Sequence, residues 1–322
     1  MSRCFCCLRR ARSPRCRTPA DANRLLSGSG NTMQLVVNIV VLAAIYALIA
    51  SGYVLVYRAS RVLNLAHGEL MMLGSYLLIA VASGISSSPV IALSGAALLS
   101  ALVGFLVYVM LIQRMTGQAV LAAVLATIAL GVMLRGLVIL IWSTQQQYPA
   151  RIIGLSNNSI ELFANARIST LSLALVVVTV LIYLALFAGL YLTQWGIRTR
   201  AVGQNPLLAA QRGINLNAIY ALTWGLSTFT GAAAGILISL DSGLDGTMTM
   251  IGLKAFPAAL VGGLDSLVGA LIGSLLIAAI EVVLIQTADP LLSDVVPFLV
   301  LIVALAIRPW GLFGTREALD RV

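Results

Sequence analysis

The sequence predicts an all-α, polytopic membrane protein, and three observations support this fold class. Hydrophobic residues make up 60% of the 322 residues, only 10% of the residues are charged, and the mean hydropathy is +1.01. Charged residues account for about a quarter of an average soluble domain. Several apolar runs reach about 18 residues, the length that a helix needs to cross the roughly 30 Å hydrocarbon layer. We expect eight to nine membrane helices.

The N-terminal tail, residues 1–32, differs in composition from the rest of the chain. It carries seven arginines, one acidic residue and all four cysteines. Of the 20 basic and 11 acidic residues in the chain, 13 and 10 lie beyond the tail, so the positive charge is mostly local and predicts no nucleic-acid partner. The tail lacks the apolar stretch of a secretory signal. We expect it to be disordered or to result from a start site assigned upstream of Met33; an arginine-rich cytoplasmic arm and a Cys-x-Cys-Cys metal clip are the alternatives.

The apolar spans follow one another closely and are separated by turn signals, arginines or polar stretches. A long polar stretch at 143–169 is predicted to be an extramembrane loop. The spans are predicted at about 34–57, 64–82, 90–112, 119–142, 170–194, 218–240, 266–287 and 290–307. We therefore expect a transmembrane domain over residues 33–314 and a cytoplasmic C-terminal tail over residues 315–322.

The positions of the arginines predict the orientation of the chain, because short loops rich in Lys and Arg stay in the cytoplasm. If residues 243–263 make one extra short crossing, only Arg151 and Arg167 remain in the loops of the opposite face. This arrangement has about nine crossings and places the N-terminus outside. The arginines predicted to lie inside are Arg58, Arg61, Arg114, Arg198, Arg200, Arg212, Arg308, Arg316 and Arg321.

A short repeat suggests two related halves. The five residues Ala-Ile-Tyr-Ala-Leu at 44–48 recur at 218–222, in spans that the predicted topology runs in opposite directions. Inverted repeats are a common basis of transporter folds. Chance is the alternative, because the chain is rich in these residue types.

The sequence lacks the residues of the common catalytic sites. Lys254 is the only lysine and follows a leucine, so the chain has no Gly-Lys-Ser/Thr phosphate loop. His67 is the only histidine, which leaves no His-rich metal site and no Gly-x-Ser-x-Gly elbow with a histidine downstream. We therefore expect neither an enzyme nor a bound cofactor or metal.

A polar stretch at 195–217 contains the signals of a short capped helix. Asn205 suits the N-cap, Pro206 suits the first helical position and Gly213 suits the exit. A helix of about two turns cannot span a membrane, so one interpretation is a docking element for a partner protein, and the other is an ordinary capped loop helix. The predicted docking residues are Asn205, Pro206, Leu207, Leu208, Ala209, Ala210, Gln211, Arg212 and Gly213.

Polar residues at the start of the second span are candidates for a solute pathway. Asn64, His67 and Glu69 are expected at the inner membrane boundary, where burial is costly without partners or water. They line the inner mouth of a pathway, or they form a helix start in which Asn64 caps the helix and Glu69 interacts with its positive dipole end.

Two further groups of residues are pathway candidates. The apolar stretch at 252–263 contains Lys254, Phe256 and Pro257, and it is predicted to be a broken or re-entrant helix, with a short interfacial helix as the alternative. Arg135 and Glu281 are isolated ionisable residues within spans, and each needs an opposite charge or a water-filled cavity. We expect both to face the interior and to be candidates for pairing with each other; snorkelling is the alternative for Arg135.

Three segments resemble one transporter family. They are Asn64–Gly74 (NLAHGELMMLG), Arg200–Asn217 (RAVGQNPLLAAQRGINLN) and Lys254–Gly273 (KAFPAALVGGLDSLVGALIG). Together they are similar to the permease subunits of branched-chain amino acid ABC importers, a family that includes urea and short-chain amide permeases, and the likeness extends over about residues 33–314. The chain departs from the family at Asp265, where glycine is usual, and at Arg135, where a neutral residue is usual.

The resemblance implies a multi-pass subunit in a bacterial inner membrane that alternates between outward-open and inward-open states. Its implied partners are a second homologous permease subunit, two cytoplasmic ATPases that hold ATP and Mg²⁺, a periplasmic substrate-binding protein and membrane lipid. Residues 206–213 would then be the coupling helix that seats on an ATPase. The expected cargo is a branched-chain or other hydrophobic amino acid, and urea or a short amide is the alternative. A stand-alone channel or secondary transporter would need no ATPase and would leave the capped helix unexplained.

Overall fold

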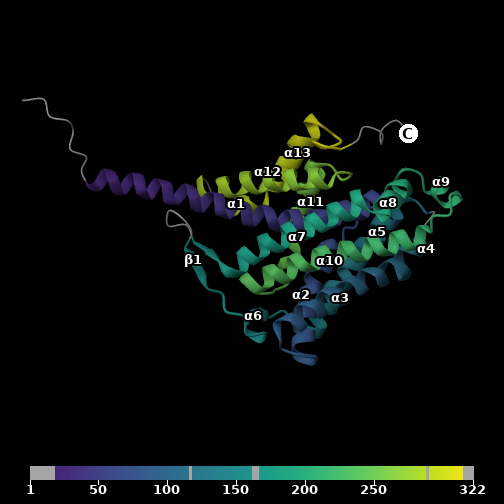
Figure 1. The fold of residues 1–322 in the computed structure, drawn as a ribbon, viewed down its shortest axis with the longest axis horizontal. Coiled ribbons are helices and arrows are strands. Elements are labelled where there is room, and N and C mark those ends of the chain that lie inside the picture. Colours follow the sequence, from purple (N-terminus) through teal and green to yellow (C-terminus); the bar gives the residue numbers. More distant parts are fainter. Residues whose placement is uncertain (1–18, 116–117, 162–166, 288–289, 315–322) are drawn as a thin grey trace, which may run out of the picture.

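The computed structural model describes residues 19–115, 118–161, 167–287 and 290–314, and these residues form an elongated helical bundle (Figure 1). Two short strands, β1 (Ser159–Glu161) and β2 (Arg167–Ser169), pair antiparallel. The helices are α1 (Pro19–Ser60), α2 (His67–Gly84), α3 (Pro89–Val107), the π-helix η1 (Tyr108–Ile112), α4 (Gln113–Met115), α5 (Val120–Trp142), α6 (Pro149–Ile152), α7 (Thr170–Leu192), α8 (Gln194–Gln204), α9 (Pro206–Gln211), α10 (Leu216–Ser242), α11 (Met248–Gly262), α12 (Leu267–Thr287), the 3-10 helix η3 (Pro290–Asp294) and α13 (Val296–Ile307).

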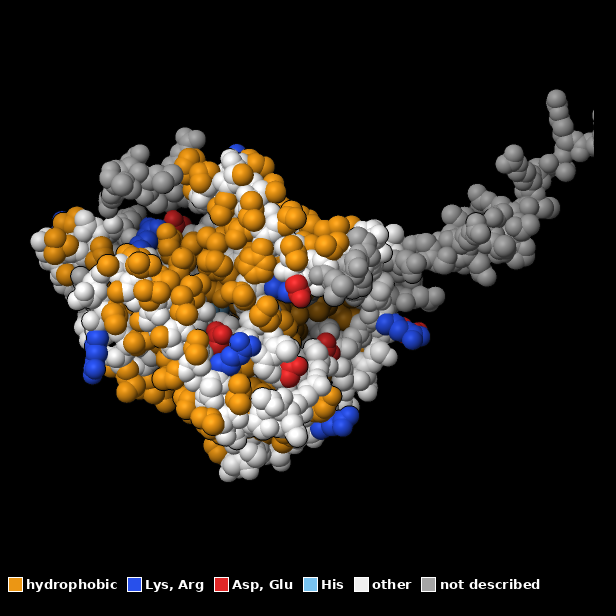
Figure 2. Space-filling model, turned by 180° about the vertical axis from the view of Figure 1, so that it is seen from behind, with side chains coloured by type: hydrophobic (Ala, Val, Ile, Leu, Met, Phe, Trp, Pro, Cys, Tyr) orange, Lys and Arg blue, Asp and Glu red, His pale blue; other side chains and the backbone are white. Residues whose placement is uncertain are grey.

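Among the described residues, six helices are long and apolar enough to cross a membrane, which confirms the prediction of an all-α, multi-pass membrane protein. The predicted number of eight to nine is reached only when the shorter helices α2, α11 and α13 are counted with them. Figure 2 shows hydrophobic side chains over most of one face of the molecule and few charged ones. The six candidate spans are Thr32–Ser60, Pro89–Met115, Val120–Trp142, Thr170–Leu192, Leu216–Ser242 and Leu267–Thr287.

The N-terminal tail differs from the prediction in part. Residues 19–32 extend helix α1, which begins at Pro19 rather than near the predicted start of the first span. Residues 1–18 and the predicted C-terminal tail, residues 315–322, lie outside the described residues.

The two ends of the bundle differ in charge. We call one of them the α9 end: it contains the C-terminus of α1 together with α4, α8 and α9 (Figure 1). Arg58, Arg61, Arg114, Arg200 and other arginines predicted to lie inside are found on these elements. The opposite end, which we call the α6 end, contains α6 and the strands. This distribution agrees with the orientation expected from the sequence.

Helices α1 and α10 form the centre of the bundle. In the most apolar 18-residue stretch of each of these two helices, 72% is buried inside the protein. The corresponding value is 22% in the spans that contain α3, α5 and α7, so their outer sides are left for lipid or partner chains. The two helices run in opposite directions, since α1 runs toward the α9 end and α10 runs away from it (Figure 1). The two spans that share the repeated pentapeptide are therefore antiparallel, as an inverted repeat requires.

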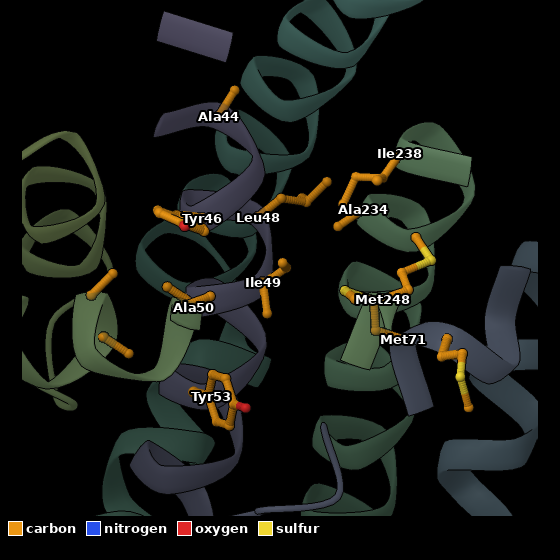
Figure 3. Close-up of a cluster of buried hydrophobic side chains, with 14 of the residues drawn as sticks. Ala44, Tyr46, Leu48, Ile49, Ala50, Tyr53, Met71, Ala234, Ile238 and Met248 are labelled. Carbon is orange, nitrogen blue, oxygen red and sulfur yellow. The ribbon is translucent and has the colours of Figure 1, made fainter. Parts of the chain in front are cut away.

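The main hydrophobic cluster lies where α1 and α10 meet α2 and α11. Leu48 of α1 points toward Ala234 and Ile238 of α10, and Met71 of α2 lies near Met248 of α11 (Figure 3). All five side chains are buried. Lipid tails are as apolar as these side chains, so close van der Waals packing rather than transfer from water holds such helices together.

Glycines allow a close contact between α11 and α12. A Cβ at Gly262 would collide with the backbone of Gly269, and a Cβ at Gly273 would meet backbone atoms of Gly262 and Ala258. The Gly-x-x-x-Gly pattern at 269–273 therefore serves helix packing.

We predict that Gly262→Ala destabilises the bundle, because rigid backbone atoms cannot move away from the added methyl group. Overpacking of this kind costs about 1–3 kcal/mol, which corresponds to a fall in melting temperature of about 5 °C. The fraction of monodisperse protein after heating in detergent measures it. Gly136→Ala on α5 is the matched control, since a Cβ there meets no atom within 4 Å. Equal melting temperatures for the two variants would contradict the packing role.

Candidate functional site

The capped helix predicted from the sequence is present as α9. The Asn205 side chain accepts a hydrogen bond from the Leu208 backbone N–H at 3.1 Å, and Pro206 occupies the first turn. Gly213 has a φ of +78°, which a glycine adopts at low cost. The prediction of a short capped helix at these residues is confirmed.

The exposed face of α9 is apolar. Leu207 is 70% exposed and Leu208 is 56% exposed, whereas Ala209 is only 4% exposed and packs against the bundle. Ala210, Gln211 and Arg212 are exposed beside the leucines. Of the predicted docking residues, Ala209 is thus unable to contact a partner, and the two leucines form the surface that is free to do so.

Sequence reasoning missed helix α8, which precedes α9. The Thr193 hydroxyl accepts a hydrogen bond from the Gly196 N–H at 3.4 Å and so caps the helix. This Thr-x-x-Gly cap was the available signal, but the polar composition of the segment suggested a loop. Because α8 packs on α1 and α7, it holds α9 at a fixed place on the bundle.

Helix α2 begins inside the bundle rather than at its edge. His67, its first residue, is fully buried, and its ring lies against Gly52 of α1 and Gly231 of α10. The Ser227 hydroxyl lies 3.5 Å from Nδ1 of His67, and the Tyr53 and His67 ring centroids are 4.6 Å apart. Ser227 is about 11 residues, or about 16 Å, from the start of α10. The predicted position of His67 at the inner boundary is therefore too shallow.

Asn64 and Glu69 flank the start of α2. The Asn64 side chain accepts a hydrogen bond from the Ala66 N–H at 3.2 Å, but Ala66 is itself the N-cap residue and α2 has no side-chain cap, so the interpretation of Asn64 as a helix cap is wrong. The Glu69 carboxylate faces α5, where a Cβ added to Gly131 would lie 3.3 Å from its Oε2. Within the described part of the chain, Asn64 Nδ2 and His67 Nε2 are buried without a hydrogen-bond partner. Buried polar atoms of this kind suit a polar solute or water better than a packed core.

Glu281 belongs to a buried charge network. The Tyr46 hydroxyl donates a hydrogen bond to Glu281 Oε2 at 2.7 Å, and Lys254 Nζ lies 3.8 Å from Oε1. Lys254 Nζ also lies 2.6 Å from Asp294 Oδ1, and its hydrogen bond and charge lower the pKa of the Asp294 carboxyl. The network joins α1, α11, α12 and η3. Tyr46 and Asp294 were not expected from the sequence.

Glu281 and Arg135 do not form the pair suggested as an interpretation of the sequence. The Arg135 guanidinium donates to Gly246 O at 3.1 Å and to Thr249 Oγ1 at 3.2 Å. Glu281 pairs with Lys254 instead. Arg135 is therefore held by the loop between α10 and α11 and does not extend along the helix toward lipid headgroups, as snorkelling would require.

The stretch around Pro257 also differs from the prediction. It is neither broken nor re-entrant, because α11 is continuous over 15 residues, about 22 Å, with the proline inside. Thr249, near its start, contacts Arg135, and Asp265, just beyond its end, pairs with Arg61 at the α9 end. Helix α11 thus links the two ends of the bundle as a short crossing. Phe256 on this helix packs against Tyr53, with ring centroids 5.3 Å apart.

Arg61 connects three elements at the α9 end. Its Nη1 lies 2.7 Å from Asp265 Oδ1, and its Nε donates to Gly203 O of α8 at 3.2 Å. Its backbone has a φ of 54°, which marks the turn after α1. The aspartate that departs from the family resemblance therefore joins the α11–α12 connection to α1 and α8.

Most of the chain matches the profile of one protein family. The profile described as "Branched-chain amino acid transport system / permease component" matches residues 35–305. The chain belongs to this family of permeases. Two curated relatives are named high-affinity branched-chain amino acid transport system permease proteins. LivH of Salmonella typhimurium is 31% identical, over 88% of this chain and 96% of its own, and BraD of Pseudomonas aeruginosa is 29% identical with the same coverage.

A solved structure, PsaBC from Streptococcus pneumoniae in complex with Fab, matches with a TM-score of 0.49 and 13% identity. The match covers 90% of this chain and 98% of that one.

For a permease, the sites fall into three levels along the bundle. The exposed leucines of α9 lie at one end, and Arg135 lies toward the other end. Between them lie the Lys254–Glu281 network and the residues that we call the His67 cluster, His67, Tyr53 and Ser227. A permease subunit needs a route through its helices and is not itself an enzyme.

Proposed function

We propose that the chain is the membrane-spanning subunit of an ATP-binding-cassette importer that moves branched-chain or other hydrophobic amino acids across a bacterial inner membrane. The observation that carries this proposal is α9, a capped helix whose two exposed leucines project from a bundle that has no phosphate-binding sequence of its own. A transporter that works alone has no use for such a surface. The names of the curated relatives support the choice of cargo.

The proposed assembly contains a second, homologous permease subunit, two ATPases that hold ATP and Mg²⁺, and a periplasmic binding protein that delivers the amino acid. The remaining apolar outer surface contacts lipid. In this assembly the α9 end faces the cytoplasm, and Asn205 to Gly213 form the element that seats on an ATPase.

The contacts around Arg61 support transmission of movement from α9 into the bundle. Helix α8 lies so close to α1 that a Cβ at Gly203 would collide with the carbonyl oxygen of Arg58. Arg61 adds its hydrogen bond to Gly203 and its ion pair to Asp265. Displacement of α9 by an ATPase therefore moves the C-terminus of α1 and the N-terminus of α12 in the same step. We propose that the His67 cluster lines the route, together with Asn64, Glu69, Lys254, Phe256, Pro257 and Glu281.

The test is to purify the full chain from its native membrane in mild detergent and to identify the proteins that accompany it by mass spectrometry. We expect an ATPase and a second permease, and leucine uptake that requires ATP after reconstitution with the binding protein. If urea or acetamide is taken up and leucine is not, the cargo is a short amide. A chain that is recovered alone and transports without ATP contradicts the proposal and favours a channel or secondary transporter.

A further inference from the structure

A cavity of about 290 Å³ opens at the α6 end, between α2, the C-terminal half of α5 and the loop that joins α10 to α11. This volume is at the lower limit for small-molecule sites, about 300–1,000 Å³. Met72 and Tyr76 of α2 and Val138 and Ile139 of α5 form an apolar wall. A small apolar group fits against such a wall.

Arg135 contributes the positive charge of the cavity. It lies inside the apolar span of α5, where an arginine costs about 2.5–3.5 kcal/mol unless it faces protein or a water-filled cavity. Its two hydrogen bonds to the α10–α11 loop both use Nη2. In the described part of the chain, no protein group accepts from its Nε or Nη1, so each of these donors is free to hydrogen-bond a carboxylate oxygen.

Asp245 contributes the negative charge and lies one residue before Gly246, whose carbonyl holds Arg135. Its Oδ1 accepts from both the N–H and the hydroxyl of Thr247, at 3.0 and 2.7 Å. These bonds fix the carboxylate on the loop, and among the described residues no side chain or backbone group donates to Oδ2. One carboxylate oxygen is thus available to an ammonium group.

We propose that this cavity is an outward-facing subsite for a zwitterionic α-amino acid with an apolar side chain. Arg135 binds the carboxylate, Asp245 binds the ammonium group and the wall of α2 and α5 receives the side chain. The inference deepens the proposed function and rests on it for orientation: α10 separates this loop from α9 by 27 residues, about 40 Å, so the cavity faces away from the proposed ATPase side. Urea and short amides carry no charges that would use both groups.

Cysteine protection tests the subsite on the full chain without partners or ATP. Cys4, Cys6, Cys7 and Cys16, the only cysteines, are replaced by serine, and Thr144→Cys places one thiol in the exposed lining of the cavity. Labelling by a polar maleimide is followed with and without L-leucine. With a dissociation constant of about 5 mM, about 50 mM leucine occupies about nine-tenths of the sites and slows labelling about tenfold.

Leucine analogues and a second thiol give the controls. Leucinamide lacks the carboxylate and 4-methylpentanoate lacks the ammonium group, so we expect neither to slow labelling of Thr144→Cys. Ile85→Cys is the matched control for position, because Ile85 is 74% exposed just after α2 and does not line the cavity. Equal protection by leucine and both analogues would mean non-specific binding to the apolar wall and would overturn the proposal.

Charge-removing variants separate binding from structure. In Arg135→Gln and in Asp245→Asn, leucine should no longer protect Thr144→Cys, while the labelling rate without leucine stays as in the parent. Arg135→Lys should keep partial protection. The proposal is overturned if leucine still protects Thr144→Cys from labelling in the Arg135→Gln variant. It is also overturned if leucine does not slow labelling of Thr144→Cys in the parent, even if the complete complex transports leucine. Failure to recover an ATPase instead contradicts the proposed function and does not affect the protection result.

Discussion

Replacing Leu207 and Leu208 together by aspartate is expected to abolish ATP-driven uptake while the chain still inserts and folds. Both side chains are more than half exposed, so the bundle loses little packing when they change. In the assembled importer the same residues would be buried against an ATPase, and two charges there remove two apolar contacts and leave two carboxylates desolvated. Loss of two interface anchors of about 2 kcal/mol each weakens association about 1,000-fold.

The measurements are ATPase recovery on the purified chain and leucine uptake in proteoliposomes, each compared with size-exclusion behaviour. The matched control is Gln194→Glu with Gln204→Glu, which adds the same two charges at exposed positions of α8. We expect the control to retain the ATPase. Ala209 is a poor test position, because a large side chain at this buried site disturbs the bundle itself. Full uptake by the double aspartate variant would remove α9 from the coupling mechanism.

Breaking the buried charge network is expected to have the largest effect on folding. In Lys254→Met, the Glu281 side chain, only 4% exposed, loses its cationic partner and keeps the Tyr46 hydroxyl alone. Removal of one member of a buried pair costs about 3–5 kcal/mol, because the other charge stays desolvated. We expect most of the Lys254→Met protein to aggregate on detergent extraction.

The double variant Lys254→Met with Glu281→Gln should recover much of the folded protein, since no unpaired charge remains and glutamine still accepts from Tyr46. Monodisperse yield and melting temperature complete this double-mutant cycle. Asp294→Asn is the control within the same network: the Asp294 side chain is 72% exposed, and exposed pairs contribute about 0–1 kcal/mol. Additive losses in the double variant would show that Lys254 and Glu281 act independently.

Sequence reasoning succeeded where the signal is local. Hydrophobic runs gave the spans within a few residues, and Asn205, Pro206 and Gly213 gave α9, because caps act over three or four positions. It failed where the answer depends on how helices are rotated against each other. Helices that are apolar on all sides carry no periodicity that would show which way Arg135 or Glu281 points. Tyr46 and Glu281 are 235 residues apart, so their contact is visible only in the folded chain.

The depth of His67 was missed for a related reason. The sequence marks where helix α2 begins but not that residues 61–66 pass into the bundle before it does. Non-helical backbone at such depth is tolerated only when protein or a cavity surrounds it, and here α1, α5 and α10 do so. A length-based prediction places every helix start at the membrane surface.

Helix α10 has a mechanical consequence. It begins five positions after the last residue of α9, and Asp245 follows its own last residue by three positions, so one uninterrupted helix spans the distance between the two ends of the bundle. Helices of this length bend only gently. A push that reaches the first turn of α10 is therefore carried to the far end as the displacement of a stiff rod, because there is no flexible joint within the helix. We infer that the timing of opening at that end follows the movement of the start of α10 directly, rather than waiting for a rearrangement within the helix.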